Sequence, residues 1–317
     1  AHTMSNLETH PTEIDCRTDV ENADPDHDGT LRVEVLTARD VPLGGPRAMT
    51  VHRTLPQRER SLIGAWCFAD HYGPDDVSVT GGMDVPPHPH IGLQTVSWLF
   101  TGEIEHRDTM GNVAMVRPGE LNLMTSGHGI AHTEVSTPDT TVLHGVQLWV
   151  ALPADAANTG RDFAHYVPPT VTVGEVSALV FLGTLLGDTS PVETFTPLVG
   201  AELRIPSGAE ITIDIDPAFE HGFLVDSGRV TIVDSSAGPL ERTELGYLGT
   251  GAETVTLANR GDDRARVIVL GGAPFDDDII MWWNFVGRTH EEIVAAREEW
   301  MAHSDRFGQV QGYTGEI

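Results

Sequence analysis

Short segments in which apolar and polar residues alternate run through most of the chain, separated by turn signals. In the first half they are LRVEVLT, TVSWLF, NVAMVR, ELNLM and TVLHGVQLWVAL, between residues 31 and 152. In the second half, between residues 176 and 272, they are VSALVFLG, AELRIP, AEITIDI, GFLVDSGRVTIVD, ETVTLAN and ARVIVLGG. A period of two is typical of strands with one buried face, so the pattern predicts two meandering antiparallel β domains.

The two halves also resemble each other. GFLVDSGRVTIVD in the second half and SWLFTGEIEHRDT in the first both join an apolar strand to an alternating strand through a turn that contains glycine. Each half then closes on a strongly apolar strand, VQLWVALP or VIVLGGAP. We therefore expect a hairpin at this place in each half and an internal duplication of one β-barrel unit.

A helix is predicted near the end of the chain. Thr289 and Glu292 have the spacing of a capping box, and Ile293, Ala296 and Trp300 form an apolar stripe. One amphipathic helix is expected to lie against the barrels, and the preceding MWWNFVG is expected to be a packed strand and turn.

The remaining segments complete the expected domain plan. The first thirty residues are acidic with little apolar periodicity, which predicts a mobile arm, and residues 1–3, before Met4, are interpreted as a vector scar. PADAANTGRDFAHYVPPT has the composition of a linker. The plan is an arm over 1–30, a first barrel over 31–155, a linker over 156–175, a second barrel over 176–280, and a helix and tail over 281–317.

The charge of the chain limits its partners. Forty-seven acidic residues face 19 basic ones, all arginine, for a formal net charge of −28. Such a surface repels phosphate backbones, so direct nucleic-acid binding is not expected; a high-salt habitat is a second reading of the same excess. No apolar run is long enough for a membrane helix, no secretory signal is seen, and two cysteines are too few for a disulfide framework. We expect a cytoplasmic protein.

Two pairs of potential metal ligands stand out in the first half. His88 and His90 are two residues apart in an expected strand, and so are His132 and Glu134. Side chains at i and i+2 project from the same face of a strand, so each pair offers adjacent donors. Three imidazoles and one carboxylate suit Fe²⁺ first, with Mn²⁺, Ni²⁺, Cu²⁺ and Zn²⁺ as alternatives.

Other histidines leave alternatives open. His106 and Asp108, with a distant histidine such as His144, form a rival two-histidine, one-carboxylate set; the other interpretation places His106 and Asp108 around the ligands. Gln94 has an even offset from His90 and is expected to face the same interior, where it either donates to a ligand or substrate or is satisfied by backbone. His128, between two glycines, is either a gate or an exposed loop residue.

The sequence excludes several other chemistries. It has no Walker loop, no G-x-G-x-x-G before a helix, no G-x-S-x-G elbow and no C-x-x-C. Nucleotide binding on a phosphate loop, serine hydrolysis and sulfur-based redox chemistry are therefore unsupported.

Three motifs of the first half resemble those of a known family. The motifs HPHIGLQTVSWLFTGEIEHRDTMG, RPGELNLMTSGHGIAHTE and HGVQLWVALP are similar to those of pirins, within the cupin superfamily, and the likeness extends more weakly from about residue 31 to 303. The resemblance implies an all-β bicupin: two antiparallel jelly-roll barrels facing each other, with iron in the N-terminal one only.

The resemblance also implies a ligand set, which is His88, His90, His132 and Glu134 in this sequence. The general cupin pattern has a glutamate ligand four residues after the second histidine, where this chain has Gln94; in pirins the H-x-E supplies the carboxylate instead. The second half has His221 but no H-x-H, which agrees with a barrel without metal.

Several pirins resemble quercetin 2,3-dioxygenases, which implies a metal-dependent dioxygenase acting on a flavonol or other enolic phenol with O₂. In that mechanism Glu134 would accept the substrate's hydroxyl proton. The alternative is a non-catalytic, iron-dependent redox-sensing regulator that acts through a protein partner. A third reading is a metal that only stabilises the fold.

Overall fold

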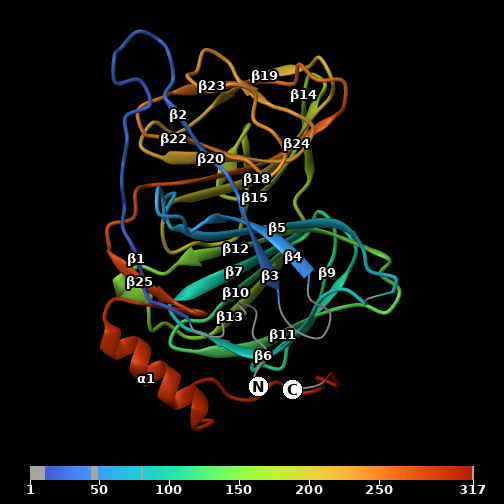
Figure 1. Cartoon of the computed structure of the whole chain (residues 1–317), viewed down its shortest axis with the longest axis vertical. Helices are drawn as coiled ribbons and strands as arrows, with labels where there is room; N and C mark the ends of the chain where they lie inside the picture. Colours follow the sequence, from blue (N-terminus) through green and yellow to red (C-terminus); the bar gives the residue numbers. More distant parts are fainter. Residues whose placement is uncertain (1–10, 44–48, 80, 316–317) are drawn as a thin grey trace.

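Two β-barrels are stacked on each other, and one helix lies beneath the first of them (Figure 1). The computed structural model describes residues 11–43, 49–79 and 81–315. The ladders of both barrels are antiparallel, as the alternating pattern predicts. Residues 1–10, which include the expected vector scar, and residues 316–317 lie outside the described part.

The first barrel is a seven-stranded sheet facing a four-stranded one. The larger sheet has the order β13 (Asp162–Tyr166), β10 (Leu121–Thr125), β7 (Leu93–Thr101), β12 (Val142–Ala151), β5 (Trp66–Asp76), β4 (Met49–Leu55), β3 (Arg39–Leu43). The smaller sheet has the order β6 (Asp84–His90), β11 (Ile130–Ser136), β8 (Ile104–Asp108), β9 (Val113–Val116).

The second barrel follows the same plan. Its larger sheet has the order β14 (Thr170–Val173), β15 (Val176–Leu182), β18 (Leu198–Ile205), β24 (Ala265–Gly272), β20 (Glu220–Ser227), β22 (Leu245–Leu248), β2 (Val33–Leu36). Its smaller sheet has the order β19 (Glu210–Asp214), β23 (Thr254–Ala258), β21 (Thr231–Ile232), and a short ladder joins β16 (Thr184–Leu185) to β17 (Asp188–Thr189).

The strand orders of the two barrels correspond position for position. In the larger sheets, β5-β12-β7-β10 corresponds to β18-β24-β20-β22, and in the smaller sheets β6-β11-β8 corresponds to β19-β23-β21. The structure thus shows the internal duplication that the repeated strand pattern predicts.

The expected hairpins are wrong in both halves, and for the same reason. β7 pairs with β10 and β12, whereas β8 pairs with β9 and β11. In the second barrel β20 pairs with β22 and β24, whereas β21 pairs with β23. The turn after β7 or β20 therefore carries the chain from one sheet to the other, a crossing that local alternation does not reveal.

The expected domain boundaries also differ from the observed ones. β2, expected in the first barrel, pairs with β22 and forms an edge of the second barrel. The corresponding edge of the first barrel is β13, which pairs with β10 and comes from the expected linker, as does β14. Each barrel is therefore completed by a strand from outside its expected range.

The acidic arm is not mobile over its described part. β1 (Ile14–Cys16) pairs with β25 (Ile279–Trp282), and the side chains of Cys16 and Ala23 are fully buried. The carboxylate of Asp24 also accepts hydrogen bonds from the backbone N–H groups of Asp28 and Gly29. The backbone N–H of Ala23 donates to the carbonyl of Thr250 at 2.8 Å, so residues 11–30 contact both the C-terminal segment and the second barrel, and the expectation of a mobile arm is corrected for them.

The C-terminal segment packs beneath the first barrel. A short 3₁₀ turn at Ala154–Ala156 joins β12 to β13, and the elements that remain are β25, β26 (Phe285–Gly287) and α1 (His290–Met301). Thr289 caps α1 by accepting from the N–H of Glu292, as predicted, and the Glu292 carboxylate accepts from the N–H of Arg288. Ile293 and Ala296 are buried. No helix within the described ranges is long and apolar enough to cross a membrane.

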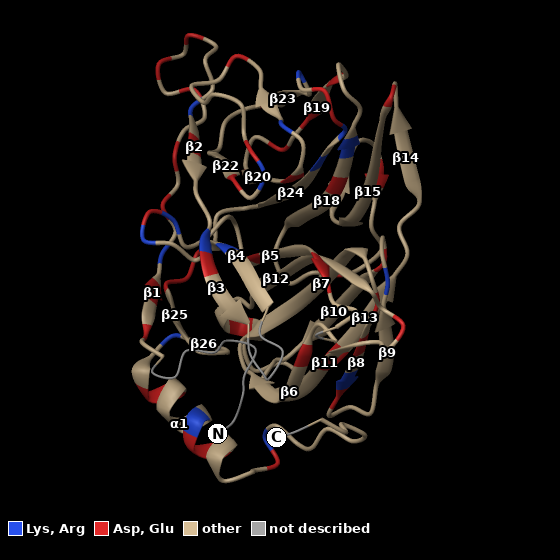
Figure 2. Ribbon diagram, turned by 45° about the vertical axis from the view of Figure 1, so that its right-hand side comes forward, with Lys and Arg blue, Asp and Glu red and all other residues tan. Residues whose placement is uncertain are grey.

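Acidic residues and arginines are interspersed over the loops and strand ends of both barrels and on α1 (Figure 2). This distribution agrees with the net charge of −28 being a property of the whole surface rather than of one tail. The expectation that nucleic acid is not a partner stays a prediction.

The largest apolar cluster of the described residues lies between the barrels. It joins residues of both larger sheets, among them Trp98 and Phe181, whose ring centroids are 4.5 Å apart. The Trp66 indole N–H lies 3.2 Å from the carbonyl of Val199 and 3.1 Å from that of Gly271, both in the second barrel. The central strands β5, β12 and β7 of the first barrel's larger sheet are thus buried on both faces over most of their length.

Replacing Phe181 by alanine tests how much this shared core contributes. Phe181 is fully buried, so Phe181→Ala should lower the free energy of unfolding by about 3–5 kcal/mol in urea titrations of metal-free protein. Phe195→Ala, at a side chain that is 46% exposed, should change it by about 0.5 kcal/mol or less. Equal effects of the two substitutions would contradict a core shared between the barrels.

Candidate metal centre

Three buried histidines converge inside the first barrel. His88 and His90 lie on β6 and His132 lies on the adjacent β11, where His132 is the direct cross-strand partner of His88. One nitrogen of each imidazole lies within 4.8 Å of the others, and the three side chains are at most 1% exposed. The two i, i+2 positions on neighbouring strands thus bring donors together as the sequence pattern predicts.

Backbone carbonyls fix the tautomers of the first two imidazoles. His88 Nδ1 lies 2.8 Å from the carbonyl oxygen of Pro86, and His90 Nδ1 lies 3.1 Å from that of Asn284. A carbonyl oxygen only accepts, so each Nδ1 carries the proton and each Nε2 of the neutral ring carries a lone pair.

A relay of side chains fixes the third imidazole. His106 Nε2 donates to the Asp108 carboxylate at 2.7 Å, which leaves a lone pair on His106 Nδ1. His132 Nδ1 faces that lone pair at 3.4 Å, so it is the nitrogen that carries the proton. His132 Nε2 is then also left with a lone pair. His106 and Asp108 therefore lie around the ligands, and the rival ligand set does not form.

This arrangement fits a cation. His90 Nε2 and His132 Nε2 are 3.1 Å apart with lone pairs facing each other, and His88 Nε2 is buried without a hydrogen-bond partner among the described residues. Three desolvated lone pairs that face one another are unfavourable unless a metal ion accepts them. Imidazole suits Fe²⁺, Mn²⁺, Ni²⁺, Cu²⁺ and Zn²⁺, so the donor set does not choose among them.

Burial keeps these imidazoles neutral. Desolvation lowers the pKa of His88 to about 4 and lowers the pKa values of His90 and His132 well below the ordinary value of 6.5. The neighbouring imidazoles act in the same direction, because a proton on one ring repels a proton on the next. The donors are therefore in the form that binds metal at neutral pH.

Glu134 is close to the histidines but is not part of the three-histidine group. Its Oε1 lies 3.7 Å from His132 Nδ1 and accepts a hydrogen bond from Gln147 Nε2 at 3.1 Å. Burial raises its pKa. The assignment of Glu134 as the fourth ligand stays a prediction.

A small cavity adjoins Glu134. Its volume is about 20 Å³, and its walls come from β5, β12 and the neighbouring strands. It is lined by Leu43, Val51, Phe68, Asp70, Tyr72, Met83, Val85, Glu134, Gln147 and Trp149. A cavity of this size holds about one water molecule.

Gln94 does not hydrogen-bond to a candidate ligand, and His128 does not lie at an entrance to the centre. Gln94 Nε2 donates to Thr125 Oγ1 at 3.0 Å, and its Oε1 is buried with no partner among the described residues. The parity argument fails because Gly92, with a φ of +70°, turns the chain between His90 and Gln94. His128 is an exposed loop residue that contacts Asn158 Oδ1 at 3.0 Å.

His144 lies away from this centre. Its Nε2 is 2.5 Å from an oxygen of Asp226 in the second barrel, so it contributes to a contact between the barrels. The sequence offered no signal for this, because the partner is 82 residues away in the chain.

In the second barrel the positions of the donors are occupied by apolar side chains. β19 corresponds to β6 and buries Ile211 and Ile213, and β23 corresponds to β11 and buries Val255 and Leu257. His221 lies on β20 between the rings of Phe219 and Phe223. Within the described residues, no group of three metal donors lies in this barrel alone.

Sequence reasoning missed three residues that hold the candidate ligands: Pro86, which acts through its backbone carbonyl, Asn284 and Gln147. Asn284 acts through its backbone carbonyl, which no side-chain pattern reveals, from the turn between β25 and β26. Gln147 could have been found, because it is two residues from Trp149 on β12 and shares its face, where both side chains line the cavity.

Removing one imidazole should abolish stoichiometric metal binding. In His88→Ala only two of the three imidazole donors remain. We therefore expect less than about one tenth of the wild-type metal content once unbound metal has been removed by dialysis. His128→Ala, at the exposed loop, should retain full content. Elemental analysis of both variants purified without chelator makes the comparison, and full metal content in His88→Ala would contradict the site.

His221 should make the second barrel sensitive to acid. Burial lowers its pKa to about 4, so between about pH 6.5 and pH 4 the unfolded chain binds a proton that the folded chain does not. The free energy of unfolding should therefore fall as the pH falls through this range, by up to about 3 kcal/mol from this residue. In urea titrations from pH 7 to pH 4, the free energy of unfolding should fall less for His221→Leu than for wild type and as much as wild type for His128→Leu. A His221→Leu profile parallel to that of wild type would contradict a contribution of His221 to this fall.

Comparison with known proteins agrees with the geometry. The family model described as Pirin matches residues 48–150, and the model described as the Pirin C-terminal cupin domain matches residues 200–308. A Pseudomonas aeruginosa protein named "Putative quercetin 2,3-dioxygenase PA1205" is 43% identical over 281 residues, which cover 88% of this chain and 87% of that protein. Mouse pirin is 32% identical over 216 residues, which cover 67% of this chain and 74% of mouse pirin.

A solved structure shares the whole fold. The crystal structure of quercetin 2,3-dioxygenase from Acinetobacter baumannii superposes with a TM-score of 0.85 at 38% identity, covering 90% of this chain and 93% of that one. The expected all-β bicupin with a single C-terminal helix is thereby confirmed. This chain belongs to the pirin family.

Proposed function

We propose that this protein is a metal-dependent dioxygenase that cleaves a flavonol or another enolic phenol with O₂. The observation that carries the proposal is the convergence of three neutral imidazole nitrogens beside a buried carboxylate that faces a cavity. The names of the Pseudomonas and Acinetobacter relatives support the same reaction class. We take Fe²⁺ as the metal, with Mn²⁺, Ni²⁺, Cu²⁺ and Zn²⁺ as the alternatives to be compared.

His88, His90 and His132 would hold the metal, with Glu134 as the predicted fourth ligand. When bound, the metal supplies a Lewis acid and a path for electrons between the phenolate and dioxygen. The surrounding Pro86 and Asn284 carbonyls and the Asp108–His106 pair keep the three rings oriented.

Glu134 is the group that would take the proton of the substrate's hydroxyl. Its carboxylate borders the cavity, and burial raises its pKa, which makes the ionised carboxylate a stronger base. Gln147 donates to Glu134 Oε1 and so leaves its other oxygen free to accept that proton. Trp149 lines the cavity with its ring stacked on Phe68 at 3.9 Å, and these rings keep water away from the reacting phenolate.

The small size of the cavity favours a second candidate function, that of a non-catalytic regulator. At about 20 Å³ it does not admit a flavonol without movement of the side chains that line it. A filled barrel suits the alternative, a non-catalytic regulator in which oxidation of bound iron alters contacts with a protein partner. Under the dioxygenase proposal, substrate binding must displace side chains at the cavity wall.

Glu134→Gln should separate these functions. We expect kcat for a flavonol to fall by about 100-fold or more at saturating metal, because the amide cannot accept the proton, while the three histidines still bind metal. Oxygen uptake is measured after anaerobic loading with each metal in turn, and Glu210→Gln, at an exposed carboxylate of the second barrel, should keep wild-type activity.

Two outcomes would count against the dioxygenase. One is the absence of metal-dependent oxygen uptake by the wild type with any flavonol or simpler enolic phenol. The other is unchanged turnover in Glu134→Gln. If the first is accompanied by a change in partner binding when bound iron is oxidised, the regulator is the better description.

A further inference from the structure

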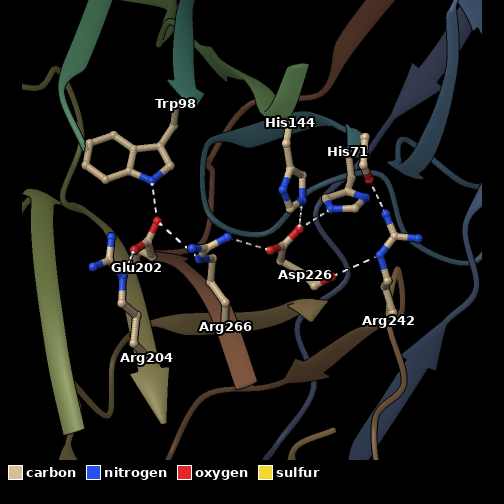
Figure 3. A network of polar contacts seen from close by, with 9 residues as sticks. His71, Trp98, His144, Glu202, Arg204, Asp226, Arg242 and Arg266 are labelled. Carbon is tan, nitrogen blue, oxygen red and sulfur yellow. Dashed lines mark hydrogen bonds and ion pairs between the residues drawn. The ribbon is translucent and has the colours of Figure 1, made fainter. Parts of the chain in front are cut away.

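A second buried histidine cluster lies between the barrels and is not used by the proposed reaction (Figure 3). Asp226, at the end of β20 in the second barrel, receives His71 of β5 and His144 of β12 from the first barrel. Both Nε2 atoms lie 2.5 Å from the same oxygen, Asp226 Oδ1. Asp226 is fully buried, His71 is 1% exposed and His144 is 7% exposed.

Asp226 is an ionised carboxylate with balanced charge. Arg266 of β24 lies 3.1 Å from its Oδ2, and Arg242, in the loop between β21 and β22, donates to its backbone carbonyl at 3.1 Å. Burial acts to raise the pKa of Asp226, but the hydrogen bonds from His144 and His71 outweigh it and hold the pKa well below its ordinary value. Two further ionisable side chains lie nearby: Glu202 of β18, 3.9 Å from Arg266, and His52 of β4, whose ring centroid is 6.0 Å from that of His71.

The cluster suits hydrogen bonds rather than a second metal. Burial lowers the pKa of His71, so a neutral ring donates its Nε2 proton to the carboxylate. A cation would require both imidazoles to give up these protons and would lie beside the Arg266 guanidinium. One carboxylate oxygen with two N–H donors is a clamp that joins β5 and β12 to the second barrel.

The strands held by this clamp are those that form the cavity beside Glu134. On β5, Phe68, Asp70 and Tyr72 line the cavity, and His71 projects from the opposite face toward the second barrel. On β12, Gln147 and Trp149 line the same cavity.

The two strands are also direct neighbours in the sheet that forms this wall of the cavity. Asp70 is the cross-strand partner of Gln147, and Phe68 is the partner of Trp149. A shift of β5 against β12 would therefore move Gln147, and with Gln147 the carboxylate of Glu134 to which it donates.

We propose that Asp226 of the second barrel is a positioning residue for the cavity of the first barrel, acting through His71 and His144 on the strands that carry Gln147 and Trp149. The identification of that cavity as a substrate site rests on the proposed function; the structural coupling does not. The second barrel thereby contributes to the site without holding a metal.

The test compares two buried carboxylates on the same strand of the second barrel, each of which reaches the first barrel. Asp226→Asn removes the charge and replaces one carboxylate oxygen by an NH2 group, which cannot accept from the imidazoles or from Arg266. Glu220→Gln is the matched control, because Glu220 accepts from the N–H of Gly64, outside the cavity wall, and from the hydroxyl of Tyr247. His144→Leu removes one donor of the clamp, because leucine has no N–H group to donate, and it replaces Asp226→Asn if the latter does not fold.

The first readout is independent of metal and activity. The side-chain amide signals of Gln147 are followed by NMR in metal-free protein, assigned by their absence in Gln147→Glu, together with hydrogen exchange of the backbone amides of β5 and β12. We expect the Gln147 signals to shift and exchange in both strands to accelerate by about ten-fold or more in Asp226→Asn, and neither change in Glu220→Gln. Asp226→Glu, which keeps the carboxylate, should restore part of the wild-type spectrum.

The second readout uses the metal-loaded enzyme. Asp226→Asn should lower kcat/KM for a flavonol about ten-fold at full metal content, and Glu220→Gln should not. Unchanged Gln147 signals, or equal changes in both variants, would overturn the inference. Loss of one equivalent of metal in Asp226→Asn would overturn it too, by showing a second metal site. An inactive wild type would refute only the proposed function, since the NMR and exchange comparison remains decisive.

Discussion

The central strands β5 and β12 of the first barrel are buried on both faces over most of their length, and the rest of the structure depends on this constraint. Alternation along β5 and β12 sends one set of side chains into the barrel and the other set against the second barrel. The same two strands therefore build the cavity wall and the interface. A displacement on one face cannot be confined to that face, because the strands have no free surface on which to relax.

The candidate metal centre depends on groups that are not ligands. The lone pairs of the three histidines face one another only because their opposite ring nitrogens are held by Pro86, by Asn284 and by His106. Asn284 belongs to the turn between β25 and β26, and its neighbours Trp283 and Phe285 pack with Ile91 in one apolar cluster. The C-terminal segment is thus part of the site: its packing fixes one carbonyl, and that carbonyl fixes one imidazole.

The sequence was sufficient where the determining pattern is local. Strand alternation, the capping box at Thr289 and the i, i+2 pairs all depend on residues a few positions apart, and the structure has the strands, the cap and the three converging histidines. Gln94 shows that such a pattern holds only within one uninterrupted strand. The turn at Gly92 separates His90 from Gln94, so their even spacing does not place the two side chains on the same face.

Long-range pairing could not be predicted in the same way. The segment LRVEVLT does not indicate that β2 pairs with β22, more than two hundred residues later. The segment GFLVDSGRVTIVD likewise does not distinguish a hairpin from a chain that crosses from one sheet to the other. Both outcomes follow from the closure of a barrel, which needs an edge strand from whichever segment reaches it. His144 is the same case, because its partner Asp226 is defined only once the barrels meet.

The two barrels share one strand order but differ in what fills their interiors. Ile211, Ile213, Val255 and Leu257 fill the interior where the first barrel has histidines and a glutamate, so the second barrel has an apolar core that needs no cation. A rigid apolar barrel can hold an ionised carboxylate at its surface in a fixed position, provided that donors surround it as they surround Asp226. A barrel with its own metal centre would be subject to the ligand and redox changes of that centre. The apolar replacement therefore gives the second barrel the constancy that the positioning of β5 and β12 requires.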